Sequence, residues 1–131
     1  MQSVLAGLTV VEVSKSPAAG LATMVMADFG AQVVWFEYGG EDDDYRVGHR
    51  GKNRVQVELA PDSEPAQSHA DAIRAHILAS SDVFVTDLSA HRIGQLGLDW
   101  PSLGAASPVL VHHEVSAIGD VNPFSPLAAD G

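Results

Sequence analysis

The sequence predicts an α/β fold, a Rossmann-like three-layer sandwich with about five mainly parallel strands. Two observations lead to this prediction. Short apolar segments rich in β-branched residues recur along the chain, as is typical of strands buried on both faces. Helix-like segments lie between them, and strands that alternate with helices form parallel sheets through right-handed crossovers. The chain has 131 residues, so we expect a single domain over residues 1–131.

The first unit of the chain is predicted to be strand, helix, strand. Residues 9–13 and 32–37 are apolar and β-branched, and form the first two predicted strands. Between them, Leu21, Val25 and Phe29 recur at helical spacing on one stripe. We expect this stripe to face the core.

Three more strands are expected after a long polar connection over residues 38–54. They begin near Val55, Asp82 and Val109. A helix over residues 63–79 is predicted between the third and fourth strands, and two short helices between the fourth and fifth. The predicted core consists of Val11, Val13, Leu21, Val25, Phe29, Val34, Val57, Ile73, Ile77, Val83, Val85 and Val111.

Composition excludes several classes of function. The net charge of −10, from 17 acidic and 7 basic residues, disfavours nucleic-acid binding because phosphate backbones are repelled. No apolar run is long enough to span a membrane, and no basic region precedes the first apolar segment, so we expect a cytoplasmic protein. The absence of cysteine excludes disulfides, thiolate zinc sites and a cysteine nucleophile. The histidines lack metal-ligand spacing, and we expect no metal.

The seven basic residues are unevenly distributed. Four of them, Arg46, Arg50, Lys52 and Arg54, fall within nine residues. One interpretation is a local anion site on an otherwise acidic protein. The other is a solvated loop whose cations neutralise the acidic residues 41–44. A dinucleotide is not the expected anion, because the first loop, SKSPAAG, lacks the G-x-G-x-x-G fingerprint.

Five segments occur in a characteristic order and spacing: LAGLTVVEVS, GLATMVMADFGAQVVWFE, HRGKNRVQVEL, DVFVTDLSAHRIGQLGLDWPSL and PVLVHHEVSAIG. In these segments the chain resembles the N-terminal part of the family III CoA-transferases, the CaiB/BaiF family. The resemblance implies an enzyme that moves CoA between carboxylic acids. In that family an aspartate attacks the acyl-CoA thioester. We expect this catalytic aspartate to lie beyond residue 131, so no catalytic residue is assigned and activity of the chain alone is left open.

The resemblance also implies which residues contact CoA. They lie in the first loop, in the basic segment, after the fourth strand and after the fifth strand. These residues are Pro17, Ala18, Arg50, Gly51, Lys52, Asn53, Arg54, Thr86, Asp87, Leu88, Arg92, Ser116 and Ala117.

Four positions depart from the family's pattern. Asp87 and Leu88 replace an asparagine–phenylalanine pair, which places an anion near the expected CoA phosphates. Gln95 stands where a basic residue is usual, although Arg92, one turn earlier, can substitute. Trp35 replaces a common lysine.

Three functional hypotheses therefore remain open. The chain is the CoA-binding part of a CoA-transferase, a non-catalytic relative that serves binding or assembly within a larger protein, or a doubly wound domain that binds another anionic metabolite. Family members are longer and form interlocked dimers, so we also expect self-association, or a missing C-terminal segment or partner chain.

Overall fold

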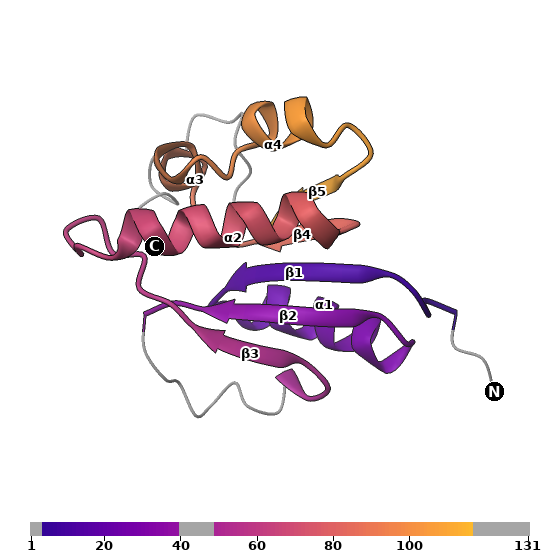
Figure 1. The fold of residues 1–131 in the computed structure, drawn as a ribbon. Helices are drawn as coiled ribbons and strands as arrows, with labels where there is room; N and C mark the ends of the chain where they lie inside the picture. Colours follow the sequence, from indigo (N-terminus) through magenta and orange to yellow (C-terminus); the bar gives the residue numbers. More distant parts are fainter. Residues whose placement is uncertain (1–3, 40–48, 117–131) are drawn as a thin grey trace.

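The computed structural model describes residues 4–39 and 49–116 (Figure 1). Its sheet has five strands in the order β3-β2-β1-β4-β5, and every neighbouring pair is parallel. The strands are β1 (Thr9–Ser14), β2 (Gln32–Glu37), β3 (Asn53–Gln56), β4 (Val83–Thr86) and β5 (Val111–Glu114). The predicted fold class is confirmed, and each strand begins within two residues of its predicted start.

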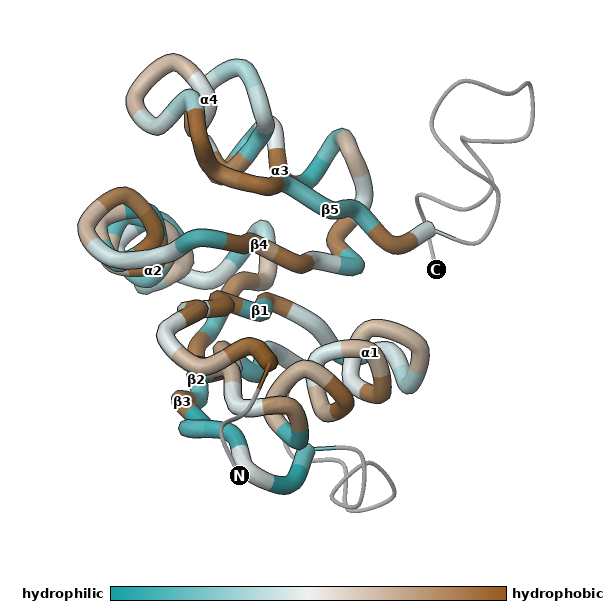
Figure 2. The backbone as a smooth tube through the Cα atoms, turned by 90° about the vertical axis from the view of Figure 1, so that its right-hand side faces the viewer, coloured by the Kyte–Doolittle hydropathy of each residue, from teal (hydrophilic) through white to brown (hydrophobic). Residues whose placement is uncertain are grey.

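Four helices cover the two faces of the sheet. They are α1 (Pro17–Asp28), α2 (Ala66–Ser80), α3 (Ala90–Leu96) and α4 (Trp100–Ala106). Figure 2 shows α1 on one face of the sheet, with α2, α3 and α4 on the other. The sandwich is therefore unequal, because a single helix has to cover one whole face.

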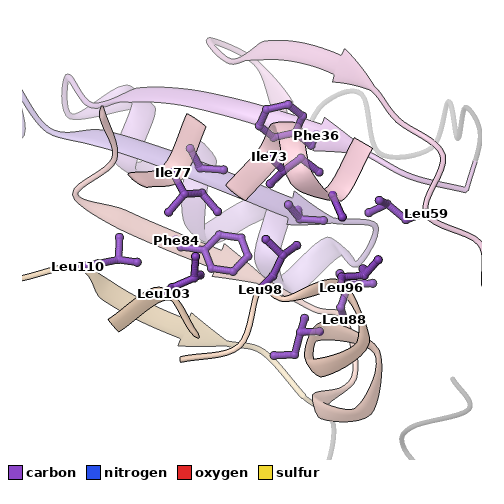
Figure 3. Packing of buried hydrophobic residues seen from close by; sticks show 14 residues of the cluster. Phe36, Leu59, Ile73, Ile77, Phe84, Leu88, Leu96, Leu98, Leu103 and Leu110 are labelled. Atoms are coloured by element: carbon purple, nitrogen blue, oxygen red, sulfur yellow. The ribbon is translucent and has the colours of Figure 1, made fainter. Parts of the chain in front are cut away.

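The larger hydrophobic core lies between the sheet and α2, α3 and α4 (Figure 3). A smaller core lies under α1 and contains Val10, Ala19, Ala31, Val33 and Val85. Among the predicted core residues, Val11, Val13, Ile73, Ile77 and Val85 are buried, whereas Val34, Val57 and Val83 are only partly buried.

The predicted core stripe of α1 is wrong. Leu21, Val25 and Phe29 are 56%, 44% and 51% exposed. The helix instead buries the three small residues Ala19, Gly20 and Thr23 together with Met24. Because α1 is apolar on nearly every side, spacing alone could not identify the buried face. Small residues allow a closer approach to the sheet.

The prediction that Val111 is a core residue is also wrong. Its side chain is 57% exposed. Val111 lies on the edge strand β5, paired with Val83. Since Val83 packs into the smaller core under α1, Val111 shares that face of the sheet, where α1 is the only helix within the described residues.

Candidate functional site

The first loop, Lys15–Ser16, connects the carboxyl end of β1 to α1. Ser16 caps α1, and its Oγ accepts a hydrogen bond from the backbone N–H of Ala19 at 3.3 Å. Pro17 occupies the first helical position, where its missing N–H costs nothing. Pro17 and Ala18 are both exposed, so the first turn of α1 presents a helix N-terminus, which favours anions, to solvent.

Asp87 holds this first loop in place. One carboxylate oxygen accepts hydrogen bonds from the backbone N–H groups of Lys15, at 2.9 Å, and Ser16, at 2.6 Å. The other accepts the hydroxyl hydrogen of Tyr38 at 2.7 Å. Burial, together with the Asp87 charge, raises the pKa of Tyr38, so this hydroxyl stays protonated and donates. Aspartate at this position therefore has a structural use: it ties the first loop to the end of β4.

The two neighbours of Asp87 are buried. Thr86 Oγ1 accepts a hydrogen bond from the backbone N–H of Leu88 at 3.1 Å, which forms the turn after β4. Ser116, by contrast, is exposed two residues after β5. Ala117 lies outside the described residues.

Lys15 was not singled out by sequence reasoning, yet it is a cation at this edge of the sheet. The residue is exposed, and its Nζ lies 6.0 Å from the centroid of the Tyr38 ring. It takes part in none of the ion pairs found between described residues. A lysine in the loop that leads into a helix N-terminus was the available signal.

Arg92 makes contacts within the fold. Its guanidinium donates to the backbone oxygen of Leu59 at 2.5 Å and to Gln95 Oε1 at 3.0 Å. Its buried Nε has no hydrogen-bond partner among the described residues. Gln95 stands where the family usually has a basic residue, and Arg92 is the cation that can substitute for it. These two residues therefore contact each other on α3.

Three cations of the basic segment form ion pairs with carboxylates far away in the sequence. Arg50 contacts Asp28 at 2.8 Å, Lys52 contacts Glu12 at 2.8 Å, and Arg54 contacts Glu37 at 2.7 Å. Arg46 and the acidic residues 41–44 lie outside the described residues.

The predicted site residues do not all gather at one end of α1. Arg50 contacts Asp28, the last residue of α1, which lies about 16 Å along the helix from Pro17. Asn53 pairs with Val34, well before the carboxyl end of β2. The basic segment therefore enters β3 from its amino end, although the Arg54 guanidinium reaches Glu37, the last residue of β2. Apart from Arg92, which lies on α3, the other described site residues lie at or after the carboxyl ends of their strands.

A buried polar cluster lies between α1 and the sheet. Glu12, in the middle of β1, is fully buried, and its carboxylate accepts hydrogen bonds from Ser14 Oγ at 2.5 Å and Thr23 Oγ1 at 2.6 Å in addition to Lys52. A glutamate within the apolar strand TVVEVS is the signal that could have revealed the cluster, since buried charges need partners.

His49 also belongs to this buried cluster, through contacts with Trp35 and Lys52. Its ring stacks on Trp35 with centroids 3.4 Å apart and planes at 3°. Lys52 Nζ lies 2.6 Å from His49 Nδ1. Burial, and then the charge of Lys52, lower the pKa of His49 to about 4. At neutral pH the imidazole is therefore uncharged, and Nδ1 accepts a hydrogen from the ammonium group of Lys52.

Metal sites and membrane spans were also sought within the described residues. Over residues 4–39 and 49–116, no three His, Asp or Glu side chains are grouped so that they could hold a metal ion. In the same ranges, none of the helices has the length and apolarity to cross a membrane.

Comparison with known proteins identifies the family. The family model for CoA-transferase family III matches residues 5–129. The chain belongs to CoA-transferase family III. The resemblance seen in the five sequence segments is thereby confirmed.

Curated relatives include two kinds of CoA enzyme. The chain is 27% identical over 130 residues to the succinyl-CoA–L-malate CoA-transferase alpha subunit of Chloroflexus aurantiacus, covering 92% of this chain and 30% of the relative. It is 29% identical over 124 residues to the human alpha-methylacyl-CoA racemase, covering 95% of this chain and 31% of the relative. The chain thus spans about a third of the length of these family members.

Solved structures share the fold. A hypothetical protein of Mycobacterium tuberculosis aligns with a TM-score of 0.78 and 22% identity, over 94% of this chain and 36% of that one. A CaiB/BaiF family protein of Brucella suis aligns with a TM-score of 0.77 and 24% identity, over 95% and 36%.

Proposed function

We propose that this chain is the part of a family III CoA-transferase that binds CoA or acyl-CoA, and that further polypeptide supplies the catalytic aspartate for moving CoA between carboxylic acids. The observation that supports this most is the first loop, which Asp87 fixes so that an exposed helix N-terminus lies at the carboxyl edge of the sheet. Ligands of open α/β sheets bind at this edge. Family membership makes CoA the expected ligand.

The binding groups that we propose are the first turn of α1 and the loops after β4 and β5. Pro17, Ala18 and Ser116 are exposed there, and Thr86, Asp87 and Leu88 form the turn behind them. Lys15 adds a cation beside the helix N-terminus, where a phosphate group is favoured. Arg54 is paired with Glu37 at the carboxyl end of β2. Arg50, which is paired with Asp28 at the far end of α1, contacts the same ligand only if CoA, an extended molecule, lies along that helix, and the same holds for its neighbours Gly51 and Asn53.

The alternative is a non-catalytic relative that serves binding or assembly. It is favoured because the side chains of Asp87 and Arg92 form hydrogen bonds to other residues of the chain. We propose the reducing cytoplasm as the location, because both a CoA-binding protein and a sequence without cysteine fit it.

Calorimetric titration of CoA into the purified chain tests the proposal. The Ala18→Glu variant places a carboxylate at the helix N-terminus, where it stabilises the helix but repels phosphate. The matched control is Ala22→Glu, one turn further along the exposed side of the same helix. We expect Ala18→Glu and Lys15→Ala to weaken binding, and Ala22→Glu to bind as the native chain does. Absence of heat at millimolar CoA for the native chain favours the non-catalytic alternative.

A further inference from the structure

Glu12 connects three segments of the chain through one buried carboxylate. Ser14, one partner, is the last residue of β1 and directly precedes the first loop. Thr23, the second partner, lies in the middle of α1. Lys52, the third, directly precedes β3. Both the Glu12 and Lys52 side chains are completely inaccessible to solvent.

All three hydrogens of the Lys52 ammonium group have acceptors within the fold. Nζ lies 2.8 Å from Glu12 Oε1, 3.0 Å from the backbone oxygen of Gly20 and 2.6 Å from His49 Nδ1. A lysine has three donors and no acceptor, so its hydrogen-bonding capacity is filled. Contact between Lys52 and a phosphate requires that one of these buried bonds be broken.

The His49 ring, one of the three acceptors of Lys52, is packed on both sides. A Cβ placed on Gly20 would lie 2.8 Å from His49 Nε2, so the imidazole ring lies directly against the helix backbone. On its other side the ring stacks on Trp35. Trp35 Nε1 in turn donates to the backbone oxygen of Ser14 at 3.1 Å.

The first loop is consequently held between two carboxylates. On one side Asp87 accepts the backbone hydrogens of Lys15 and Ser16. On the other side Glu12 holds Ser14 and, through Thr23, the body of α1. The loop and the first helical turn therefore depend on both groups for their position.

We propose that Glu12 and Lys52 are positioning residues that set the first loop and the first turn of α1 for the coenzyme, and that Lys52 acts through Glu12 rather than by contacting a phosphate. This inference rests on the proposed function. It gives Lys52 a role in positioning the binding groups, in place of the direct contact with CoA that the resemblance implies. The cation that contacts phosphate at this edge is then Lys15.

The test compares Glu12→Gln, Lys52→Met and the double variant by calorimetric titration with CoA. If the pair positions the loop, both single variants weaken CoA binding by at least about tenfold, because small displacements of binding groups are costly. The double variant loses no more than either single one, since the two residues act as a unit. If Lys52 contacts CoA itself, Lys52→Met loses affinity while Glu12→Gln retains native affinity, and the proposal is overturned.

A second readout needs no ligand. In both single variants, hydrogen exchange should accelerate more at the backbone amides of residues 15–20 than at the backbone amides of α2. Uniform acceleration across the chain contradicts a positioning role. Should Lys52→Met fail to fold, Thr23→Val removes one hydrogen bond to Glu12 with little change of shape, and the same local acceleration is expected. Failure of native CoA binding refutes the proposed function, whereas the exchange result decides the positioning role separately.

Discussion

Lys52 Nζ lies 2.8 Å from Glu12 Oε1, and neither side chain has any exposed surface. Burial lowers the pKa of Lys52, and the charge of Glu12 and its hydrogen bond oppose that shift. Lys52 therefore depends on Glu12 to keep its ammonium group charged at this buried position. The pair connects the start of β3 to the centre of the sheet, on the face that α1 covers alone.

Removal of one partner should strongly destabilise the fold. We expect Lys52→Met to lower the free energy of unfolding by about 3–5 kcal/mol, because it leaves a buried carboxylate without its counter-ion. Urea denaturation followed by circular dichroism measures the change. Arg50→Ala is the control, since Arg50 and Asp28 form an exposed, solvent-screened pair whose loss should change stability little. Equal losses in the two variants would contradict the buried arrangement.

Gly20 should be required by the His49 ring rather than by backbone conformation. Alanine ordinarily stabilises a helix interior by about 1 kcal/mol relative to glycine. At Gly20 the added Cβ would lie 2.8 Å from His49 Nε2, so we expect Gly20→Ala to destabilise the protein. Gly94, in α3, is the matched control because a Cβ there meets nothing within 4 Å, and Gly94→Ala should raise the melting temperature. Stabilisation by both substitutions would show that the ring is placed elsewhere.

Acid should weaken the cluster through His49. The pKa of His49 is lowered to about 4 in the folded chain from 6.5, so between these values the unfolded state binds a proton that the folded state does not. Stability is therefore lost as pH falls from about 6.5 to about 4, by at most roughly 3 kcal/mol. Urea midpoints measured across this range should fall less steeply for His49→Gln, which cannot titrate. The same slope in both proteins would refute this assignment.

The exposed face of α1 should promote association. Leu21, Val25 and Phe29 form an apolar stripe on a helix whose one charged residue, Asp28, is paired with Arg50. Exposed apolar stripes of this kind commonly mark interfaces. We expect sedimentation velocity to detect self-association of the chain.

The double variant Leu21→Lys/Val25→Lys should shift that equilibrium toward monomer. Ala75→Lys, on the exposed side of α2, is the control and should leave it unchanged. A native chain that is strictly monomeric at high concentration would contradict the role of this face.

Hydrophobic periodicity predicted the fold because it records which strands are buried. Residues 9–13 and 32–37 are apolar enough to specify central strands, and the helical segments between strands specify parallel pairing. Periodicity failed for α1, where apolar residues surround the helix and the buried face is chosen by contacts that arise only in three dimensions. Thr23 faces inward to bond Glu12, and Gly20 faces inward to admit His49.

The candidate site was only partly predictable. The resemblance indicated Pro17, Ala18 and Asp87, which meet at one edge of the sheet. It also grouped Arg50 and Lys52 with them, but side-chain partners far away in sequence, Asp28 and Glu12, decide where these cations lie. A linear pattern of charges does not contain that information. Whether these residues contact CoA stays a prediction.

The most direct test of CoA binding at the carboxyl edge is hydrogen exchange of the native chain with and without CoA. We predict that CoA slows exchange in residues 15–20 and 86–88, where the first loop, the first turn of α1 and the turn after β4 lie together. Protection confined to other segments, such as α4 and β5, or no protection at saturating CoA, would contradict the account.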